Sequence, residues 1–282
     1  RRSGKKPQPP HFSRFLFLAR PVQSAWQVVD QRISRDREEK HMESPGYIIL
    51  SRQTALQREL SIVANNIANV NTTGFKAEMA LYDKFEVTDN TGRKHDFVVD
   101  LGSVRDLGAG AMQPTGNPFD LAIGGEGFFA IAEGTETFYT RNGSFAVDNE
   151  GKLVTRAGGA VLDAGGNPIL LPVGSSQITI TKDGLVQADG EEVGTISVVS
   201  FENPQDMKKR GNSYLATEQE AKPVEKTNVL QGMLEGSNVQ SMTELTKLID
   251  IHRAYERASK IVKQEDERQR DVIRRLGRPA QA

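Results

Sequence analysis

The sequence predicts a mainly β protein, in which a Gly-rich antiparallel β domain is flanked by N- and C-terminal α-helices that pair as a coiled-coil-like assembly module. Three observations predict this fold class. Apolar residues recur at steps of three and four near each end of the 282-residue chain, which is typical of narrow helical seams. Nineteen of the 26 glycines lie between Gly102 and Gly211, where turn formers separate short β-prone runs. No helical pattern separates those runs, so we expect antiparallel pairing.

The first 41 residues form a basic segment that differs from the rest of the chain. Residues 1–41 carry ten Lys and Arg against four Asp and Glu, a net charge of +6, whereas the overall net charge is −1. The segment contains a proline-rich stretch and lacks sustained periodicity, which predicts a flexible tail. Its one apolar run, 15–19, is too short for the core of a signal peptide. Because Met42 is the first methionine, we expect the working subunit to begin there.

Residues 42–76 are expected to hold the N-terminal helix and the turn that ends it. The helix is predicted over 47–70, and Ser44-Pro45 supplies a cap residue and a first-turn proline. The run 69–74 is expected to end the helix, because Asn and Gly accept left-handed backbone conformations. The seam of this helix consists of Ile49, Leu56, Leu60, Val63 and Ile67.

An extended connection is predicted over 77–117, followed by the outer β domain over 118–227. Runs rich in β-branched and aromatic residues predict strands at 119–123, 128–131, 145–147, 152–155, 177–181 and 195–201. Asn-Gly, Asp-Gly and Gly-Gly-Asn-Pro sequences predict the turns between them at 142–143, 149–151, 165–168 and 182–184.

Residues 228–282 are expected to hold the C-terminal helix and a charged tail. The helix is predicted over 241–263, with Ser241 or Thr243 as cap and Glu244 placed favourably for the helix dipole. The charged stretch 264–278 is either a continuation of the helix or a frayed tail. The seam of this helix consists of Leu248, Ile251, Tyr255, Ala258 and Val262.

The two narrow seams raise the question of what covers them. A pair of helices that is attached to a β domain only by its ends buries few side chains for the backbone entropy that it loses. Contacts with neighbouring subunits would stabilise such a pair. Packing of both helices on the β domain is the alternative, to which periodicity alone gives equal weight.

Several blocks of the sequence carry a resemblance to a known family. The segment VANNIANVNTTGFKAE (63–78) resembles the N-terminal signature of the bacterial flagellar basal-body rod and hook axial proteins. The segments 115–129, 139–155, 229–240 and 251–256 are similar to that family as well, so the resemblance covers nearly all of 42–282. Within the family, the short opening and compact middle are most similar to the proximal rod protein. A distal rod or hook-type subunit is the alternative.

The resemblance implies a structural subunit of the flagellar basal-body rod. Such a subunit self-assembles helically with other copies and with other rod axial proteins, and forms part of the drive shaft and export channel. Its terminal helices pair inside the tube and its β domain lies outside. The resemblance also implies passage through the flagellar type III export apparatus without a cleaved signal peptide, and a final place in the periplasm-spanning rod.

Two groups of signature residues receive roles as hypotheses. Asn65, Asn66 and Asn69 lie late in the helix, where their amides can hydrogen-bond across subunits and fix the register, as buried Asn does in coiled coils. A weakly held helix end is the equally weighted alternative. The second group is expected to turn the chain outward, with the phenylalanine packing at the corner, and it consists of Asn71, Thr72, Thr73, Gly74 and Phe75.

The sequence holds no recognisable catalytic, cofactor-binding or metal-binding constellation. Cysteine is absent, which removes disulfides, thiolate metal sites and thiol nucleophiles. The four histidines, His11, His41, His95 and His252, lack the paired spacing of metal sites. The near-zero net charge gives no reason to expect nucleic acid, and no apolar run is long enough for a transmembrane segment. We therefore expect neither enzyme activity nor a cofactor.

The runner-up class is a soluble carbohydrate- or peptide-binding β module with helical flanks, and an enzyme of another type ranks third. A binding module would stay monomeric, whereas a rod subunit would self-associate or assemble with other axial proteins. The dependence of particle size on concentration therefore distinguishes the first two classes.

Overall fold

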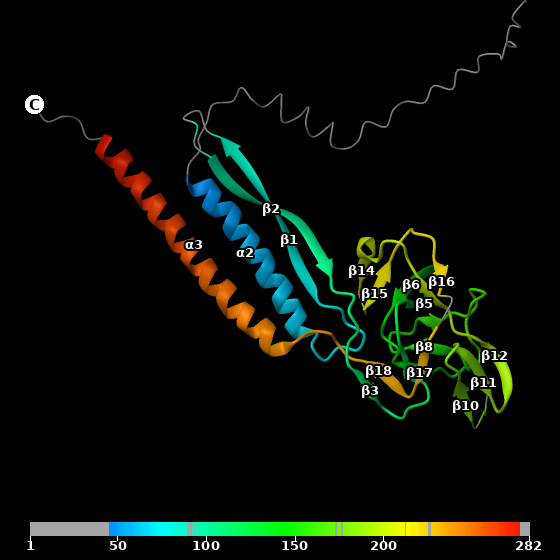
Figure 1. The fold of residues 1–282 in the computed structure, drawn as a ribbon. Coiled ribbons are helices and arrows are strands. Elements are labelled where there is room, and N and C mark those ends of the chain that lie inside the picture. The colour runs from blue at the N-terminus through cyan, green and yellow to red at the C-terminus, as the bar shows by residue number, and fades with distance from the viewer. Residues whose placement is uncertain are drawn as a thin grey trace, which may run out of the picture. The chain divides into compact units, whose positions relative to one another are not determined.

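The computed structural model describes residues 45–88, 92, 94–172, 174–175, 177–211, 213–224 and 227–276. The predicted basic tail over 1–41 and the predicted helix cap Ser44 lie outside the described residues. The described chain is mainly β, with one helix near each end (Figure 1). In chain order its elements are α2 (Pro45–Ala68), β1 (Glu78–Thr88), β2 (Lys94–Arg105), β3 (Met112–Pro114), β4 (Leu121–Ile123), β5 (Phe128–Glu133), β6 (Glu136–Thr140), β7 (Phe145–Val147), β8 (Leu153–Thr155), β9 (Ala160–Val161), β10 (Ile178–Ile180), β11 (Leu185–Ala188), β12 (Glu191–Thr195), β13 (Val198–Ser200), the 3-10 turn η2 (Pro204–Asp206), β14 (Lys208–Arg210), β15 (Tyr214–Ala216), β16 (Lys222–Pro223), β17 (Val229–Gln231), β18 (Met233–Glu235) and α3 (Ser241–Leu276).

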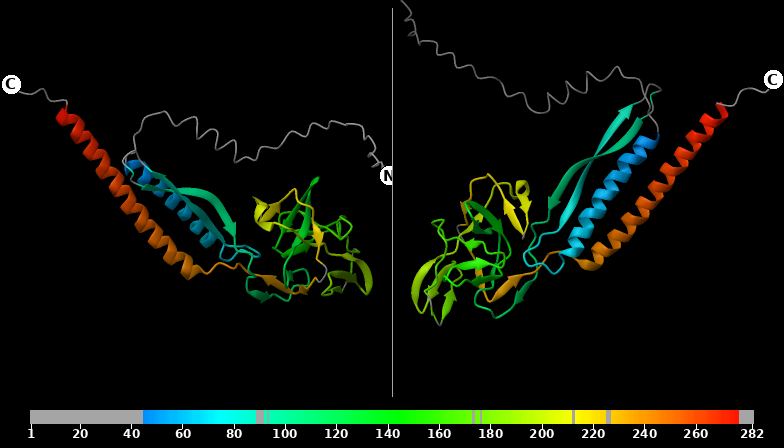
Figure 2. Two further views of the ribbon diagram at one scale, coloured as in Figure 1. Left: turned by 45° about the horizontal axis from the view of Figure 1, so that its top comes forward. Right: turned by 180° about the vertical axis from the view of Figure 1, so that it is seen from behind.

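Helices α2 and α3 lie side by side, although they come from opposite ends of the described chain (Figures 1 and 2). Helix α2 also packs against the two-stranded ribbon formed by β1 and β2. The Tyr82 hydroxyl of β1 donates to the Ala55 carbonyl oxygen at 2.6 Å, and Arg58 Nε lies 3.9 Å from Asp100 Oδ2 of β2. Helix α2 therefore packs chiefly on α3 and on the ribbon, and not as a cover of the β domain.

The β1–β2 ribbon occupies most of the stretch that the sequence predicted as an extended connection. Its strands pair antiparallel from Glu78 opposite Arg105 to Thr88 opposite Lys94, with a bulge between Leu81 and Tyr82. The sequence does contain the signal for a hairpin, because apolar and polar residues alternate in both strands and turn formers separate them. One face of the ribbon packs on α2, whereas Met79, Leu81 and Phe85 of β1 are each about half exposed.

The largest sheet of the β domain has the strand order β14-β15-β6-β5-β9-β8-β7, and β13 joins it by pairing with β5 and β16. All pairings between the described strands are antiparallel, as the sequence predicted. The core beneath this sheet includes Leu121, Phe129 and Ile131, each with 0% exposure. The rings of Phe129 and Phe145 meet edge to face, with their centroids 5.2 Å apart. The β domain therefore buries its own apolar side chains.

Three smaller sheets complete the β structure. Strands β10, β11 and β12 form a three-stranded sheet, and its second hairpin turns at Asp189-Gly190. Two short pairs, β17 with β4 and β18 with β3, join the segment before α3 to the segment that leads into the β domain. Glu235, the last residue of β18, is thereby held opposite Met112 of β3.

Helix α3 continues to Leu276, well beyond the predicted end at residue 263. The charged stretch is therefore helical over 264–276, which decides between the two alternatives that the sequence left open. Ion pairs at helical spacing support this part, with Arg268 Nη2 2.6 Å from Glu265 Oε1 and Arg270 Nη2 3.0 Å from Asp266 Oδ2.

Candidate functional site

The predicted seam of α2 is partly covered within the single chain. Val63 is 4% exposed, and the other four seam residues are half-buried: Ile49, Leu56, Leu60 and Ile67. Ala55 and Ile62 are also buried, although the prediction did not include them. They were missed because a narrow heptad stripe describes one contact face, whereas α2 contacts both α3 and the ribbon.

The predicted seam of α3 contains the least exposed apolar side chains of that helix. Ile251 and Ala258 are 7% and 4% exposed, while Leu248, Tyr255 and Val262 are half-buried. Helix α2 lies alongside α3 and contributes to this burial. Each chain covers much of both seams by itself. That the seams also make contacts between subunits therefore stays a prediction.

Asn66 ties α2 to the two elements beside it. Its side chain is 1% exposed, and its amide nitrogen donates to the Glu78 carbonyl oxygen at 2.8 Å and to Glu244 Oε2 at 3.0 Å. Its amide oxygen accepts a hydrogen bond from the Glu78 N–H at 3.0 Å. Both amide hydrogens are used within the chain, so Asn66 fixes α2 against β1 and α3 where the sequence suggested a bond across subunits.

Substitution of Asn66 by Ala is expected to lower the free energy of unfolding by about 2–3 kcal/mol, because buried partners lose their hydrogen bonds. Asn65→Ala is the matched control on the same helix, since the Asn65 side chain is exposed; its effect should stay within about 0.5 kcal/mol. Urea unfolding of both variants measures the difference. Equal losses in the two variants would contradict the role given to Asn66.

Asn65 and Asn69 have different surroundings at the end of α2. The Asn69 amide nitrogen donates to the Asn65 carbonyl oxygen at 2.8 Å, and its amide oxygen accepts from the Thr72 hydroxyl at 3.1 Å. The first bond adds to the one that the Asn65 carbonyl oxygen accepts from the Asn69 N–H at 3.2 Å, and the second joins the helix end to the turn that follows. The Asn65 side chain has no hydrogen bond among the residues that the structure describes. A hydrogen bond across subunits therefore stays a prediction, and Asn65 is the better placed of the two to make it.

Residues 71–74 form a turn that brings the chain from α2 to the ribbon. Asn71 is exposed, and the remaining turn residues are half-buried or buried: Thr72, Thr73 and Gly74. Gly74 has a φ of +68°, and its N–H donates to the Glu235 carbonyl oxygen at 2.7 Å. Phe75 is half-buried, and Lys209 Nζ lies 5.1 Å from the centre of its ring. The turn is thus held by residues of β18 and β14.

A buried ion network lies directly behind this turn. Glu235 has 0% exposure, and its Oε1 accepts from Lys76 Nζ at 2.6 Å and from the Gly110 N–H at 2.9 Å. Its Oε2 lies 2.7 Å from Arg141 Nη2 and accepts from Arg141 Nε at 2.9 Å. One carboxylate is therefore paired with two buried cations, Lys76 beside the turn and Arg141 at the end of β6.

The rest of the network is saturated by backbone oxygens. Lys76 Nζ also donates to the Gly108 carbonyl at 2.7 Å, and Arg141 Nη1 donates to Gly125 and Gly127 at 2.8 and 2.7 Å. Burial lowers the pKa of Lys76, and the bond to Glu235 opposes that shift. No sequence pattern predicts this network, because the partners of Glu235 lie 94 and 159 positions away from it.

A second group of charges borders the network. Glu78 lies 2.9 Å from Lys209 Nζ and 3.8 Å from Arg105 Nε, measured to its Oε1. Arg105 Nη2 donates to the Met207 carbonyl oxygen at 2.6 Å, and burial lowers the pKa of this guanidinium. Glu78 and Arg105 belong to the ribbon, whereas Lys209 and Met207 belong to the β domain, so these contacts join the two.

A cavity of about 280 Å³ opens between these two groups of charges. None of its described lining residues is acidic, and the amide-bearing side chains Asn65 and Asn69 stand among them. Its five cationic residues are Lys76, Arg105, Arg141, Lys209 and Arg210. We call this hollow the basic cavity. Its lining favours an anionic group.

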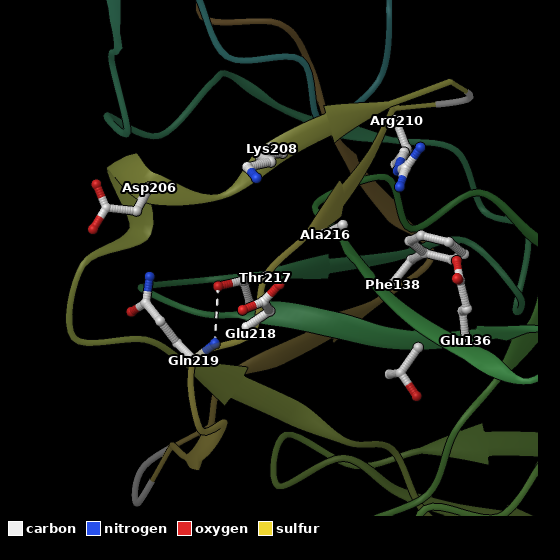
Figure 3. A pocket seen from close by; sticks show the side chains of 10 residues that line it. Glu136, Phe138, Asp206, Lys208, Arg210, Ala216, Thr217, Glu218 and Gln219 are labelled. Carbon is white, nitrogen blue, oxygen red and sulfur yellow. Dashed lines mark hydrogen bonds between the residues drawn. The ribbon is translucent and has the colours of Figure 1, made fainter.

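A larger hollow of about 640 Å³ lies on the other side of β14 (Figure 3). Lys208 and Arg210 line it together with the carboxylates of Glu136, Asp206 and Glu218. In Figure 3 the Arg210 guanidinium lies toward the Phe138 ring, and Asp206 stands at the other end of the hollow. Its charges are of both signs, so it lacks the single-sign lining of the basic cavity.

Metal-binding clusters and membrane-spanning helices are absent from the described residues. Over these residues, no group of three or more His, Asp or Glu side chains is arranged to hold a metal ion. No described helix is both long enough and apolar enough to span a membrane. His252, one of the four histidines, is an exposed helix residue with its Nδ1 3.7 Å from Glu256 Oε1.

Exposed large apolar side chains concentrate on the helices and the ribbon. Among the described residues, only Leu107 and Leu170 of this kind lie elsewhere. On α3, three of them follow helical spacing and form what we call the outer stripe: Met242, Leu245 and Ile249, with 75%, 42% and 52% exposure. The full set on helices and ribbon is Tyr47, Leu50, Met79, Leu81, Phe85, Val99, Leu101, Met242, Leu245, Ile249, Ile261, Val272 and Ile273.

Three family models match separate parts of the chain. Residues 47–76 match the model described as flagella basal body rod protein. Residues 122–188 match the flagellar hook protein FlgE/F/G D1 domain, and residues 230–275 match the C-terminal model of the flagellar basal body rod FlgEFG proteins. The three models thus fall on α2 with its turn, on the β domain, and on β17 through most of α3.

Curated proteins similar to this chain carry related names. The flagellar basal-body rod protein FlgF of Caulobacter vibrioides is 42% identical over 243 residues, which cover 84% of this chain and 99% of that protein. FlgF of Mesorhizobium japonicum is 34% identical, with the same two coverages. The flagellar basal-body rod protein FlgG of Bacillus subtilis is 31% identical over 80% of this chain and 97% of its own length.

Proposed function

The chain belongs to the flagellar basal-body rod protein family and is a structural subunit of the rod, and from this premise we propose how it assembles. We propose that α2 and α3 pair in a coiled-coil-like way and pack against the same helices of neighbouring axial subunits. Repetition of that contact builds a helical tube, which serves as drive shaft and export channel. The β domain then lies outside the tube.

The observation that carries this proposal is the distribution of apolar surface. The β domain buries its own core, whereas α2, α3 and the ribbon keep thirteen large apolar side chains exposed. Apolar surface that gathers on one part of a protein marks an interaction site. The outer stripe of α3 is distinct from its seam, because the seam lies along α2 and the stripe is left uncovered. One helix therefore offers a face to its own chain and a face to another.

The outer stripe suits a helical contact between subunits. Met242, Leu245 and Ile249 step by three and four residues, so they lie along one side of the first turns of α3. Covering side chains that are about half exposed contributes about 1 kcal/mol or more each. That gain is modest for one copy but recurs at every subunit of a helical array, which favours cooperative assembly over dimers.

The place of the subunit in the cell is proposed from the same premise. We propose a proximal position in the rod, because the short opening and compact middle of the sequence are most similar to the proximal rod protein. We further propose that it crosses the inner membrane through the flagellar export apparatus and reaches the periplasm without a cleaved signal peptide. The absence of cysteine suits a chain that relies on neighbouring subunits instead of disulfides.

Paired substitution of Leu245 and Ile249 by Asp is expected to abolish self-association while leaving the monomer folded, because both side chains point away from the seam and are exposed. The measurement is sedimentation velocity over a wide range of concentration, followed by a test of rod incorporation and motility in cells. The wild-type chain should grow in size with concentration, and the variant should remain monomeric.

Leu170→Asp is the matched control, because Leu170 is also an exposed leucine, at 54%, but lies on the β domain. It should assemble like the wild-type chain. Loss of assembly in this control, or normal assembly of the Leu245 and Ile249 variant, would contradict the proposed helical interface. A wild-type chain that stays monomeric at all concentrations and never joins other axial proteins would favour the binding-module alternative.

A further inference from the structure

We propose that the basic cavity of one copy receives the acidic tip of the β11–β12 hairpin of a second copy. The inference rests on the proposed self-assembly and names a second contact in it, made by the β domains and separate from the helices. The acidic tip is defined as Asp189, Gly190, Glu191 and Glu192. Such a contact is heterologous, because a knob of one copy meets a hollow of the next.

The basic cavity has a surplus of positive charge. Five cationic residues line it, and the carboxylates that neutralise them from behind are Glu235, Glu78 and the nearby Asp106. Two positive charges are therefore left over. Arg210 is exposed, and its guanidinium makes no hydrogen bond or ion pair with any described residue. The cavity is thus suited to an incoming carboxylate. Arg210 lines both hollows, and its guanidinium, which lies toward Phe138 in Figure 3, would turn to the rim of the basic cavity to bind one.

The cavity also offers neutral donors. Asn65 lines it with an exposed side chain that makes no hydrogen bond among the described residues. Ser213 lines it just before β15, whereas the Tyr214 hydroxyl is already paired with the Thr155 hydroxyl. Donors of this kind fix the orientation of a carboxylate that a cationic rim attracts. The contact would therefore use Asn65 for hydrogen bonding between subunits, the role that the sequence assigned to it.

The acidic tip is the complementary feature on the same chain. It places three carboxylates within four residues at an exposed β-turn, and no basic residue interrupts them. The Asp189 carboxylate accepts a hydrogen bond from the Gln177 N–H at 2.9 Å, which shapes the turn. Glu191 and Glu192 are exposed and make no ion pair with any described residue. These two carboxylates are therefore available to another chain.

Charge and geometry select a second copy as the occupant. Every copy carries the complementary feature, because the three carboxylates of the acidic tip match the surplus of positive charge in the cavity. Figures 1 and 2 draw β14 and the β11–β12 hairpin at different ends of the β domain, so the tip of a chain does not reach its own cavity. A heterologous contact that does not close on itself propagates into a helix, which is the symmetry of a rod.

Charge exchange between two variants tests the contact in the full chain. One variant carries Glu191→Arg and Glu192→Arg, and the other carries Arg210→Asp. Lys209 is left unchanged, because its pairing with Glu78 supports the fold. Each variant alone is expected to self-associate about tenfold more weakly than wild type, because like charges then face each other. An equimolar mixture should recover most of the loss, since the opposite charges meet again in the mixed contact.

The control and the outcomes separate this inference from the proposed function. Glu150→Arg reverses an exposed turn carboxylate on the same domain and should leave association unchanged. If both charge variants associate like the wild type, or if the mixture shows no recovery, the acidic-tip contact is overturned. Neither outcome contradicts the helical interface. Failure of the wild-type chain to associate at all would overturn both. Unchanged thermal unfolding of each variant verifies that the monomers are folded.

Discussion

Replacement of Glu235 by Gln is expected to lower the free energy of unfolding by about 3–5 kcal/mol, because it leaves two buried cations without a counter-charge. Lys76 and Arg141 both keep about 6% of their side chains exposed, so water does not compensate for the loss. The substitution nearly preserves the shape of the side chain, which limits its effect to charge. A decrease of about 10 °C or more in Tm should accompany it.

A double-mutant cycle distinguishes the network from a simple loss of packing. Lys76→Met alone removes a cation but leaves Glu235 paired with Arg141. The double variant, Lys76→Met with Glu235→Gln, should lose less than the sum of the single losses, because fewer buried charges remain unpaired. Glu202→Gln is the control, since its ion pair with Lys222 is exposed and should contribute within about 1 kcal/mol. Additive losses at Lys76 and Glu235 would argue against the network.

Gly74→Ala is expected to cost about 2–5 kcal/mol of unfolding free energy, the sum of left-handed strain and of overpacking. Gly74 has a φ of +68°, and a Cβ placed there would come within 2.4 Å of the Arg141 backbone carbon. Backbone atoms of Arg141 can move away only if the end of β6 shifts. That shift would also disturb the bonds of the Arg141 guanidinium to Glu235.

Gly116→Ala is the matched control, because Gly116 has a similar φ of +73° but no heavy atom within 4 Å of the added carbon. The loss of unfolding free energy in Gly116→Ala reflects only the left-handed backbone conformation, which costs about 1–2 kcal/mol. Urea unfolding of the two variants measures the excess at Gly74. If both variants lose the same amount, close approach at residue 74 is unimportant and the glycine serves only its backbone conformation.

The features with a local pattern were predictable from the sequence. Both helices were found from apolar spacing, and the buried residues Ile251 and Ala258 lie on the predicted seam of α3. The antiparallel β domain followed from its turn chemistry. Sequence spacing also placed Val63 on a contact face. These features depend on residues that are three to seven positions apart, where periodicity carries the information.

The features that depend on distant partners were not predictable. The Asn66 amide is used by Glu78 and Glu244, and nothing near residue 66 in the sequence specifies either partner. The ion network at Glu235 has the same character. The ribbon is a different case, because the alternation of its two strands is visible in the sequence, although the prediction for 77–117 is an extended connection. Its pairing is local, and a count of alternating residues on both sides of Asn90 and Gly92 would have revealed it.

The bond between Asn66 and Glu244 joins residues that are 178 positions apart. Closing a chain segment of that length costs about 5 kcal/mol of entropy, and contacts of such separation form late in folding. Because α3 is the last described element, α2 acquires its partner within the chain only when nearly all of the described residues are present.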